Sequence, residues 1–414
     1  MSVIASLALL LSLQAQTTTP QASWETLATE YDLAFEHWIH AARELAPGAE
    51  QSVHPAATWW ARFEELSDQG EGKATLWLLA NRGNLPSAPP AAGLLARVRR
   101  GGEADWVGSA LFELAASREA FDAEELDGFL EERMVEATLD PVRARAALAL
   151  AVVVAPEDAA RAAYLRTWAA MLVHQGVDLA PGEELARADL DELAGRVLDA
   201  VQRESDAYFE LAYRAGSDGV YYPVSGAPPD PEALWRPAIE ELATRGSTRA
   251  QLWALSNAPW ELDVAGKQRL RGFLEAVVAS GLSEEELRDF GWQVGGLVYR
   301  LGLEAVEPCI RRLLEKSPDA ARPGLLFGLG DAVCEASGED AAQRERGLAA
   351  LREVRERWPT ADEAKRAEGR IFFFTNLVVG KTSPDFETAD ADGNAFKLSD
   401  YRGKVTVVDF WGFW

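Results

Sequence analysis

The stretch VTVVDFWGFW, residues 405–414, is a run of β-branched and aromatic residues that carries a single charge, Asp409. A turn signal, YRGK at residues 401–404, comes directly before it. Such a run is typical of a buried strand that has a neighbour on each side. At the edge of a sheet it would be flat, apolar and prone to aggregate. The stretch therefore predicts a central strand over residues 405–411 that needs further sheet around it.

The residues before this strand predict a β-hairpin. An extended Pro-Asp-Phe segment leads into a short strand near Phe386, and a second strand covers residues 395–398. The DADGN stretch at 390–394 is similar to the start of a calcium loop, but the glycine register and the glutamate at the twelfth position are missing. We therefore interpret Asp392-Gly393 as a hairpin turn. A hairpin and one strand without a covering helix do not make a stable domain.

The order of motifs in residues 380–414 resembles the opening of the thioredoxin-like redoxins, the TlpA and AhpC/TSA kind of thiol–disulfide oxidoreductase. The Gly-Lys-x-x-Pro-Asp-Phe opening matches residues 380–386, Leu-Ser-Asp-Tyr-Arg-Gly-Lys matches 398–404, and Val-Asp-Phe-Trp-x-x-Trp matches 408–414. In this family Cys-x-x-Cys follows. The resemblance implies that residues 377–414 are the N-terminal hairpin and first central strand of a truncated thioredoxin-like α/β domain.

The same resemblance assigns roles to three residues. It implies that Asp409 is a carboxylate buried beneath the dithiol, with a pKa raised by burial, which relays protons to the resolving thiol. Trp411 and Trp414 would flank the active site as substrate-facing aromatic side chains. The nucleophilic cysteine or selenocysteine is expected directly after Trp414 and is absent, so we expect the 414-residue chain itself to be inactive. No cofactor is implied.

The position of the last residue suggests a selenoprotein. A UGA codon normally stops translation but can encode selenocysteine, and reading it as a stop would end the chain one residue before the family's nucleophile. A selenol is more acidic than a thiol and is a better nucleophile and leaving group. We therefore hypothesise that the natural protein continues with selenocysteine-x-x-Cys. A nonsense mutation, the edge of a sequenced contig and a deliberately shortened chain are the alternatives.

The rest of the chain predicts a mainly α-helical protein. Apolar residues recur at helical spacing from Ser23, a candidate N-cap, to about Phe374, with short Gly, Pro and Asp interruptions. The pattern at 349–374 is loosely similar to tetratricopeptide repeats. One irregular stretch, 216–231, predicts a long connection.

An internal repeat divides this helical part. Residues 55–81 align without a gap on residues 231–257, a shift of 176, and twelve of the 27 aligned positions are identical. We therefore predict α-solenoid-like helical repeats in two duplicated halves, 23–200 and 201–376. The tryptophans that recur at aligned positions are interpreted as helix packing, and the alternative is a concave surface that binds a protein partner.

Charge and the N-terminus restrict the location and the partners. The net charge is −25, with 66 acidic and 41 basic residues, which argues against nucleic acid and anionic membranes as partners. The apolar run at 3–13 is too short to span a bilayer but suits a secretory signal, so we interpret residues 1–22 as a signal peptide and flexible start. The sequence thus predicts export to the periplasm or an anchor in the membrane facing it. A frayed helix is the alternative.

Few other residues indicate chemistry. Cys309 and Cys334 form no CxxC motif, and a disulfide between them or two buried free thiols both fit the sequence. His37 and His40 lie one helical turn apart without a third ligand nearby, so no metal site is predicted. GEGKAT at 70–75 lacks the first glycine and the hydroxyl residue of a phosphate loop.

Two classes of function follow from these patterns. The first is an exported redoxin with a helical accessory domain, acting on a protein thiol or disulfide partner or on a peroxide. The second is a helical-repeat binding or scaffold protein with a vestigial redoxin segment.

Overall fold

The computed structural model of the chain is mainly helical, as the sequence predicts. It divides into two compact units, Met1–Ala250 and Gln251–Trp414, and the dividing point lies within helix α12 (Thr248–Ser256). The structure describes residues 23–45, 52–85, 87, 91–172, 187–216, 218–390 and 392–409. The predicted signal segment, residues 1–22, lies outside these ranges. None of the helices in the described ranges is long and apolar enough to cross a membrane.

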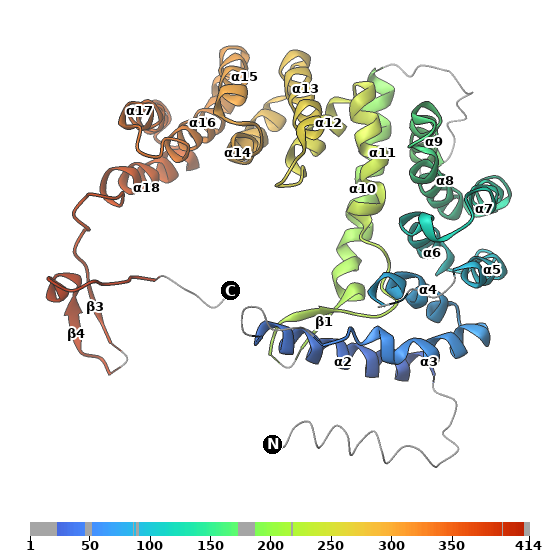
Figure 1. Cartoon of the computed structure of the whole chain (residues 1–414). Helices are drawn as coiled ribbons and strands as arrows, with labels where there is room; N and C mark the ends of the chain where they lie inside the picture. Colours follow the sequence, from blue (N-terminus) through green and yellow to red (C-terminus); the bar gives the residue numbers. More distant parts are fainter. Residues whose placement is uncertain are drawn as a thin grey trace. The chain divides into compact units, whose positions relative to one another are not determined.

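The first unit consists of helices and one small hairpin (Figure 1). Among its helices, α8 packs against α6, α7 and α9, and α4 packs against α3 and α6. The helices are α2 (Trp24–Arg43), α3 (Ala56–Asp68), α4 (Gly72–Asn81), α5 (Ala92–Arg100), α6 (Val107–Ala116), α7 (Ala123–Glu136), α8 (Asp140–Val154), α9 (Ala159–Leu172), α10 (Arg187–Ala212) and α11 (Pro231–Arg245), with 3₁₀ turns η1 (Arg82–Asn84) and η2 (Arg118–Ala120).

The sequence determines where several helices begin. Ser23 is the N-cap of α2, as predicted, and its hydroxyl accepts a hydrogen bond from the backbone N–H of Thr26. In the second unit Ser283 and Glu286 form a capping box at the start of α14 (Glu284–Leu301). Each of these side chains satisfies a backbone N–H that has no partner within the helix.

Aromatic side chains form the centre of the first unit's core. The ring of Trp77 on α4 stacks on Phe63 of α3 with 3.8 Å between ring centroids, and it meets the ring of Tyr31 of α2 edge-on at 4.9 Å. Trp77 and Phe63 are fully buried. Trp77 therefore packs between helices, which is the role that the sequence predicted for tryptophans at repeat positions.

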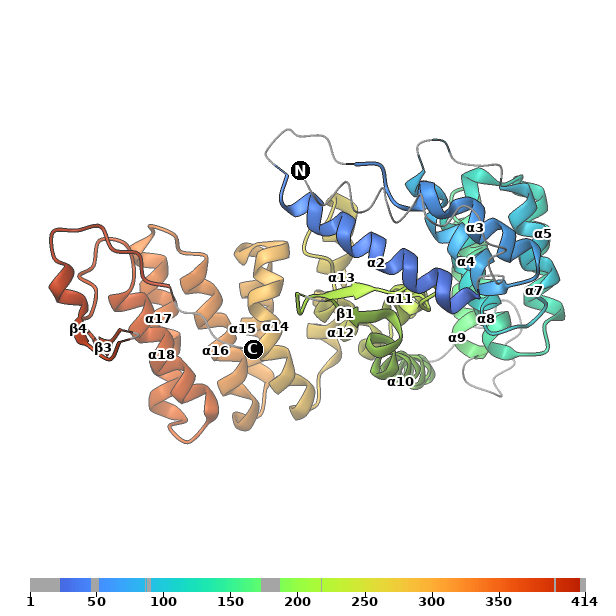
Figure 2. The same cartoon turned by 90° about the horizontal axis from the view of Figure 1, so that it is seen from below.

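A short hairpin follows α10. Strand β1 (Tyr213–Ala215) pairs antiparallel with β2 (Tyr221–Pro223), with Arg214 opposite Tyr222. The hairpin lies along α2 in both views (Figures 1 and 2). The predicted long connection, 216–231, therefore begins with this hairpin and continues as an irregular segment, residues 224–230, that ends at α11.

The second unit continues with helices, followed by a second hairpin. Strands β3 (Glu387–Ala389) and β4 (Ala395–Lys397) pair antiparallel, and the 3₁₀ turn η4 (Leu398–Tyr401) follows them. The helices are α13 (Val264–Ser280), α14 (Glu284–Leu301), α15 (Leu303–Lys316), α16 (Arg322–Glu335), α17 (Ala341–Arg357) and α18 (Asp362–Asn376), with the 3₁₀ turn η3 (Asp319–Ala321) between α15 and α16.

Glycine lets α14 and α16 approach closely. A Cβ atom on Gly291 would collide with the backbone of Gly324, and one on Gly328 would collide with the carbonyl oxygen of Gly291. The two helix backbones touch at this point, where only hydrogen fits.

The two segments that the repeat aligns have similar local structures. Residues 55–81 form α3 and α4, and residues 231–257 contain α11 and α12. Asn81 donates a side-chain hydrogen bond to the carbonyl oxygen of Trp77 at 3.0 Å, and the aligned Asn257 does the same to Trp253 at 3.0 Å. The correspondence concerns these helix pairs, and the duplication of whole halves and the solenoid arrangement stay predictions.

One predicted boundary and one predicted strand differ from the structure. The boundary between residues 200 and 201 falls inside α10, whose helical pattern continues to Ala212. The predicted strand at 405–411 is not formed over residues 405–409, where the backbone has no regular structure, and residues 410–414 lie outside the described ranges. No described strand pairs with these residues, so the hydrogen bonds that define a strand are missing.

Candidate functional site

The redoxin-like segment is held together by a contact between its first two motifs. The carboxylate of Asp385 accepts a hydrogen bond from the backbone N–H of Ser399 at 2.8 Å and another from its hydroxyl at 2.7 Å. The side-chain and backbone hydrogen bonds from Ser399 lower the pKa of Asp385. The Pro-Asp-Phe opening is therefore fixed to the end of β4 by a charged carboxylate.

The turn between β3 and β4 is the predicted hairpin turn. The side chain of Asp390 accepts hydrogen bonds from the backbone N–H groups of Asp392 and Asn394, at 3.0 and 2.8 Å. Gly393 has a φ of 84°, a conformation that favours glycine. The Asp390 carboxylate thus accepts hydrogen bonds from the backbone, whereas in a calcium loop it would bind the ion.

The three residues that the resemblance placed in the active site are not gathered into a site by the described residues. Asp409 is exposed, in contrast to the burial that the resemblance implies. Val405 and Val407 beside it are 98% and 89% exposed. A carboxylate on a strand is buried only when neighbouring strands and helices cover it, and none of the described residues does so here. Trp411 and Trp414 lie outside the described residues.

Cys309 and Cys334 are free thiols, so of the two alternatives the disulfide is not formed. Both are buried, Cys309 on α15 and Cys334 on α16. Burial raises the pKa of the Cys334 thiol to about 12, which keeps it protonated at neutral pH. It is therefore inert as a nucleophile.

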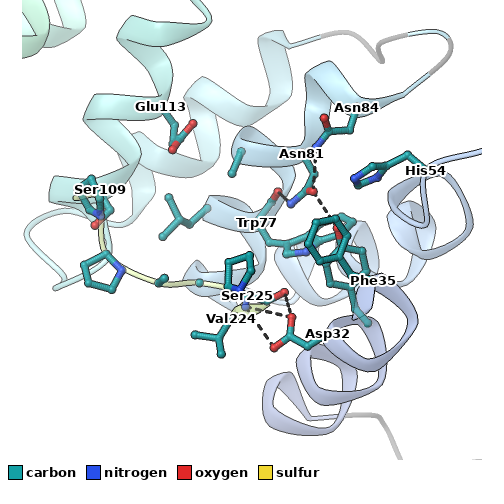
Figure 3. A pocket seen from close by; sticks show the side chains of 18 residues that line it. Asp32, Phe35, His54, Trp77, Asn81, Asn84, Ser109, Glu113, Val224 and Ser225 are labelled. Carbon is teal, nitrogen blue, oxygen red and sulfur yellow. Dashed lines mark hydrogen bonds between the residues drawn. The ribbon is translucent and has the colours of Figure 1, made fainter. Parts of the chain in front are cut away.

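The first unit contains a pocket of about 250 Å³. Three of its walls come from α2, α4 and the segment 223–229, which begins at the last residue of β2 (Figure 3). Tyr31 and Phe35 of α2 and Trp77 of α4 line it, and of these Phe35 is half-buried while Tyr31 and Trp77 are buried. The hydroxyl of Tyr31 donates to Asn81 at 3.0 Å, and this contact fixes α2 on α4 beside the pocket.

Two carboxylates reach this pocket from different helices (Figure 3). Asp32 of α2 accepts hydrogen bonds from the backbone N–H of Ser225 at 3.1 Å and from its hydroxyl at 2.6 Å, so it holds the segment 223–229 in place. Burial raises the pKa of Asp32 even though Ser225 bonds to it. Glu113 of α6 is half-buried, and burial raises its pKa as well.

A second polar cluster lies where α2 meets the β1–β2 hairpin. Glu36, His40 and Asp218 each offer a ligand atom within 4.8 Å of the others, which is a possible arrangement for a metal ion. Glu36 also pairs with Arg214, whose Nη1 lies 2.8 Å from Oε2. Tyr222 donates its hydroxyl hydrogen to Asp218 at 3.0 Å and lies 2.9 Å from Nε2 of His40.

This cluster is satisfied by its own partners. Burial alone would raise the pKa of Asp218, but hydrogen bonds from the Val220 N–H and the Tyr222 hydroxyl lower it overall. Arg43 adds a second positive charge 3.9 Å from Asp218. Two guanidinium groups beside the carboxylates oppose the binding of a cation, so we interpret the cluster as the attachment of the hairpin to α2.

Two thiol–disulfide oxidoreductases match the chain over a short stretch. ResA from Geobacillus thermodenitrificans is 47% identical over 45 residues, which is 10% of this chain and 26% of that protein. ResA from Geobacillus kaustophilus is 49% identical over 45 residues, with the same shares. The chain therefore spans about a quarter of the length of these curated relatives. No family model and no solved structure matches the chain.

These matches are consistent with a thioredoxin-like redoxin and reach no further along the chain. Sequence patterns did not reveal the pocket of the first unit. Asp32 and Ser225 are 193 residues apart, and no local spacing links them. No sequence pattern distinguishes Glu113 from the other charged residues on amphipathic helices.

Proposed function

We propose that this chain belongs to a thiol–disulfide oxidoreductase of the thioredoxin-like redoxin kind. The observation that carries the proposal is the ordered set of motifs in residues 380–414. The 45-residue similarity to the two ResA proteins supports it. The contact between Asp385 and Ser399 also supports it, because it joins two of those motifs.

The proposed chemistry is thiol–disulfide exchange. A thiolate or selenolate attacks one sulfur of a substrate disulfide, a mixed disulfide forms, and the other sulfur leaves as a thiolate that takes up a proton. A second, resolving thiolate of the redoxin then attacks the mixed disulfide and releases the second substrate thiol. The substrate disulfide gains two electrons, and the redoxin pair becomes oxidised.

The thiols within the chain are unsuited to this reaction. Cys309 and Cys334 are both buried, and the pKa of Cys334, about 12, leaves almost no thiolate at neutral pH. In the redoxin motif the attacking residue takes the position after Trp414. We propose a cysteine or selenocysteine there, with Asp409 as the proton relay and Trp411 and Trp414 beside it.

The decisive experiment reads the gene across codon 415 and about 300 bases beyond. We expect a UGA or Cys codon, then x-x-Cys and a thioredoxin-like remainder in the same frame. The extended protein, with cysteine at position 415, should catalyse dithiothreitol-dependent reduction of insulin, whereas a version with Ser at 415 should not. Turnover by the 414-residue chain alone would overturn the assignment of the nucleophile.

The location and the helical part complete the proposal. We propose export to the periplasm, directed by the apolar run at 3–13, because thiol–disulfide exchange on structural disulfides belongs to an oxidising compartment. The helical units would then act as an accessory region that docks a protein partner. Cell fractionation of the native host should find the protein outside the cytoplasm, with residues 1–22 removed or embedded in the membrane.

A helical binding or scaffold protein is the second candidate. Exposed aromatic side chains in the second unit favour it: Trp260, Trp292 and Tyr299 are 65%, 62% and 72% exposed. The rings of Trp260 and Tyr299 meet edge-on at 5.6 Å, which forms a small apolar surface. A stop codon other than UGA, with no redoxin frame beyond it, would favour this candidate.

A further inference from the structure

We propose that the pocket between α2, α4, α6 and the segment 223–229 binds an organic cation, an ammonium group on a short apolar stem. This site is separate from the redoxin-like segment and does not depend on the function proposed above. Glu113 would pair with the charge, and the aromatic walls would hold the stem (Figure 3).

The carboxylate of Glu113 is suited to pair with a cationic ligand. No described residue forms a hydrogen bond or an ion pair with its carboxylate, although the side chain is half-buried. A half-buried charge without a partner is costly, and burial raises the pKa of Glu113 as a result. An ammonium ion in the pocket would supply the missing partner and favour the charged form.

The described residues that line the pocket include no lysine or arginine. His54, the remaining basic side chain among them, has a pKa lowered by burial and is neutral at pH 7. Asp32 adds a second carboxylate from the opposite side of the pocket (Figure 3). The charged groups of the pocket are therefore acidic, which attracts a cation and repels an anion.

The walls of the pocket are partly aromatic and are held in place by their neighbours. Phe35, Tyr31 and Trp77 line the pocket, and half-buried Phe35 is the aromatic side chain that is open enough to attract a cation and cover an apolar stem, whereas Tyr31 and Trp77 are buried behind it. Trp77 is fixed by its stack on Phe63, and Tyr31 by its bond to Asn81, so little ordering is needed on binding. The volume, about 250 Å³, lies below the range of roughly 300–1,000 Å³ that drug-sized ligands occupy and suits a small amine or one lysine side chain.

The test is calorimetric titration of the 414-residue chain at pH 8 with cadaverine, a five-carbon diamine. The matched ligand is 1,5-pentanediol, which has the same stem and no charge. We expect saturable binding of cadaverine and none of the diol. A second pair of ligands, acetyl-Gly-Lys-Gly-amide and its norleucine analogue, distinguishes a free amine from a lysine side chain of a protein. Binding of cadaverine alone indicates a free amine, and binding of the lysine peptide as well indicates a protein side chain.

The variants Glu113→Gln and Glu119→Gln complete the test. Both remove one negative charge, and Glu119 is exposed and does not line the pocket. We expect Glu113→Gln to weaken cadaverine binding about tenfold or more, and Glu119→Gln to leave it nearly unchanged. Equal effects of the two variants would overturn the proposal. If Glu113→Gln fails to fold, the comparison of cadaverine with pentanediol on the unaltered chain decides, and equal binding of the two refutes the proposal.

Discussion

The carboxylate of Asp385 accepts both the backbone N–H and the hydroxyl hydrogen of Ser399, 14 residues further along the chain. These residues belong to two motifs that look independent in the sequence, Pro-Asp-Phe and Leu-Ser-Asp-Tyr-Arg-Gly-Lys. A neighbouring backbone bond, from the N–H of Leu398 to the carbonyl oxygen of Phe386 at 3.1 Å, extends the contact. These hydrogen bonds thus join the two motifs and hold the β3–β4 hairpin together.

Replacing Ser399 by Ala should raise the pKa of Asp385 towards its ordinary value. The Ser399 hydroxyl is the largest cause of the lowered pKa, and the substitution removes it while keeping the backbone N–H. Nuclear magnetic resonance titration of the Asp385 carboxyl measures this. Ser383→Ala is the control, because the Ser383 hydroxyl contacts the carbonyl oxygen of Pro384 and not the carboxylate. An unchanged pKa of Asp385 in Ser399→Ala would contradict the hydrogen bond from the Ser399 hydroxyl to the Asp385 carboxylate.

The same contact makes the hairpin sensitive to acid. The pKa of Asp385 is lower in the folded chain than its ordinary value of 3.8, so its contribution to stability is complete above that value. It is lost as the pH falls through the lowered pKa. We expect the amide hydrogens of β3 and β4 to exchange faster, relative to a peptide reference, only below about pH 4. Exchange that speeds up already between pH 5 and 7 would show that another group controls the hairpin.

Gly291→Ala should destabilise the second unit. The added methyl group would collide with the backbone of Gly324 on α16, and overpacking of this kind costs about 1–3 kcal/mol or more. Gly295→Ala is the matched control on the same helix, since a Cβ there meets nothing within 4 Å. The control should be neutral or stabilising by up to about 1 kcal/mol, because alanine favours helix over glycine. Denaturant unfolding, followed for the transition of the second unit, measures both.

Cys309 and Cys334 should be unreactive in the native chain. Both are buried and free, so Ellman's reagent should detect no thiol at pH 8 without denaturant. In guanidinium chloride, without added reductant, it should detect both. If neither thiol appears after unfolding, the two cysteines are paired in the protein, which would contradict the prediction.

Glu113→Gln should stabilise the first unit at pH 8 in the absence of a ligand. The pKa of Glu113 is raised in the folded chain, so the wild-type chain loses stability as the pH rises from the ordinary value of 4.5 through the raised pKa. Glutamine has no charge to bury and does not share this loss. The stability difference between variant and wild type should therefore grow with pH over this window. Thermal unfolding at a series of pH values checks it, and a difference that shrinks with rising pH would contradict the assignment.

The features predicted correctly from the sequence are those that depend on neighbouring residues. Helices in the body of the chain follow from apolar spacing, and Ser23 is the cap of α2 because its hydroxyl reaches an N–H only three residues away. The β3–β4 hairpin follows from Asp390 and Gly393, which build the turn locally. Trp77 was assigned to packing between helices, and its stack on Phe63 confirms this.

The features missed depend on contacts between distant parts of the chain. The pocket combines Asp32 of α2, Glu113 of α6 and Ser225 of the segment after β2. Only the packing of these three regions brings the residues together. The predicted strand is not formed over residues 405–409 for a related reason. Its apolar residues indicate a strand, but a strand also needs a paired neighbour, and the described residues supply none.

The hydrogen bonds from Ser225 to Asp32 can form only late in the synthesis of the first unit. Residue 32 leaves the ribosome 193 residues before its partner does. At a translation rate of about 5–20 residues per second, the segment that closes the pocket is made roughly 10–40 s after helix α2. Throughout that interval Asp32 lacks the hydrogen bonds that Ser225 donates to it in the folded chain. The pocket is therefore completed only late in synthesis, and slow translation lengthens the time for which it is open on this side.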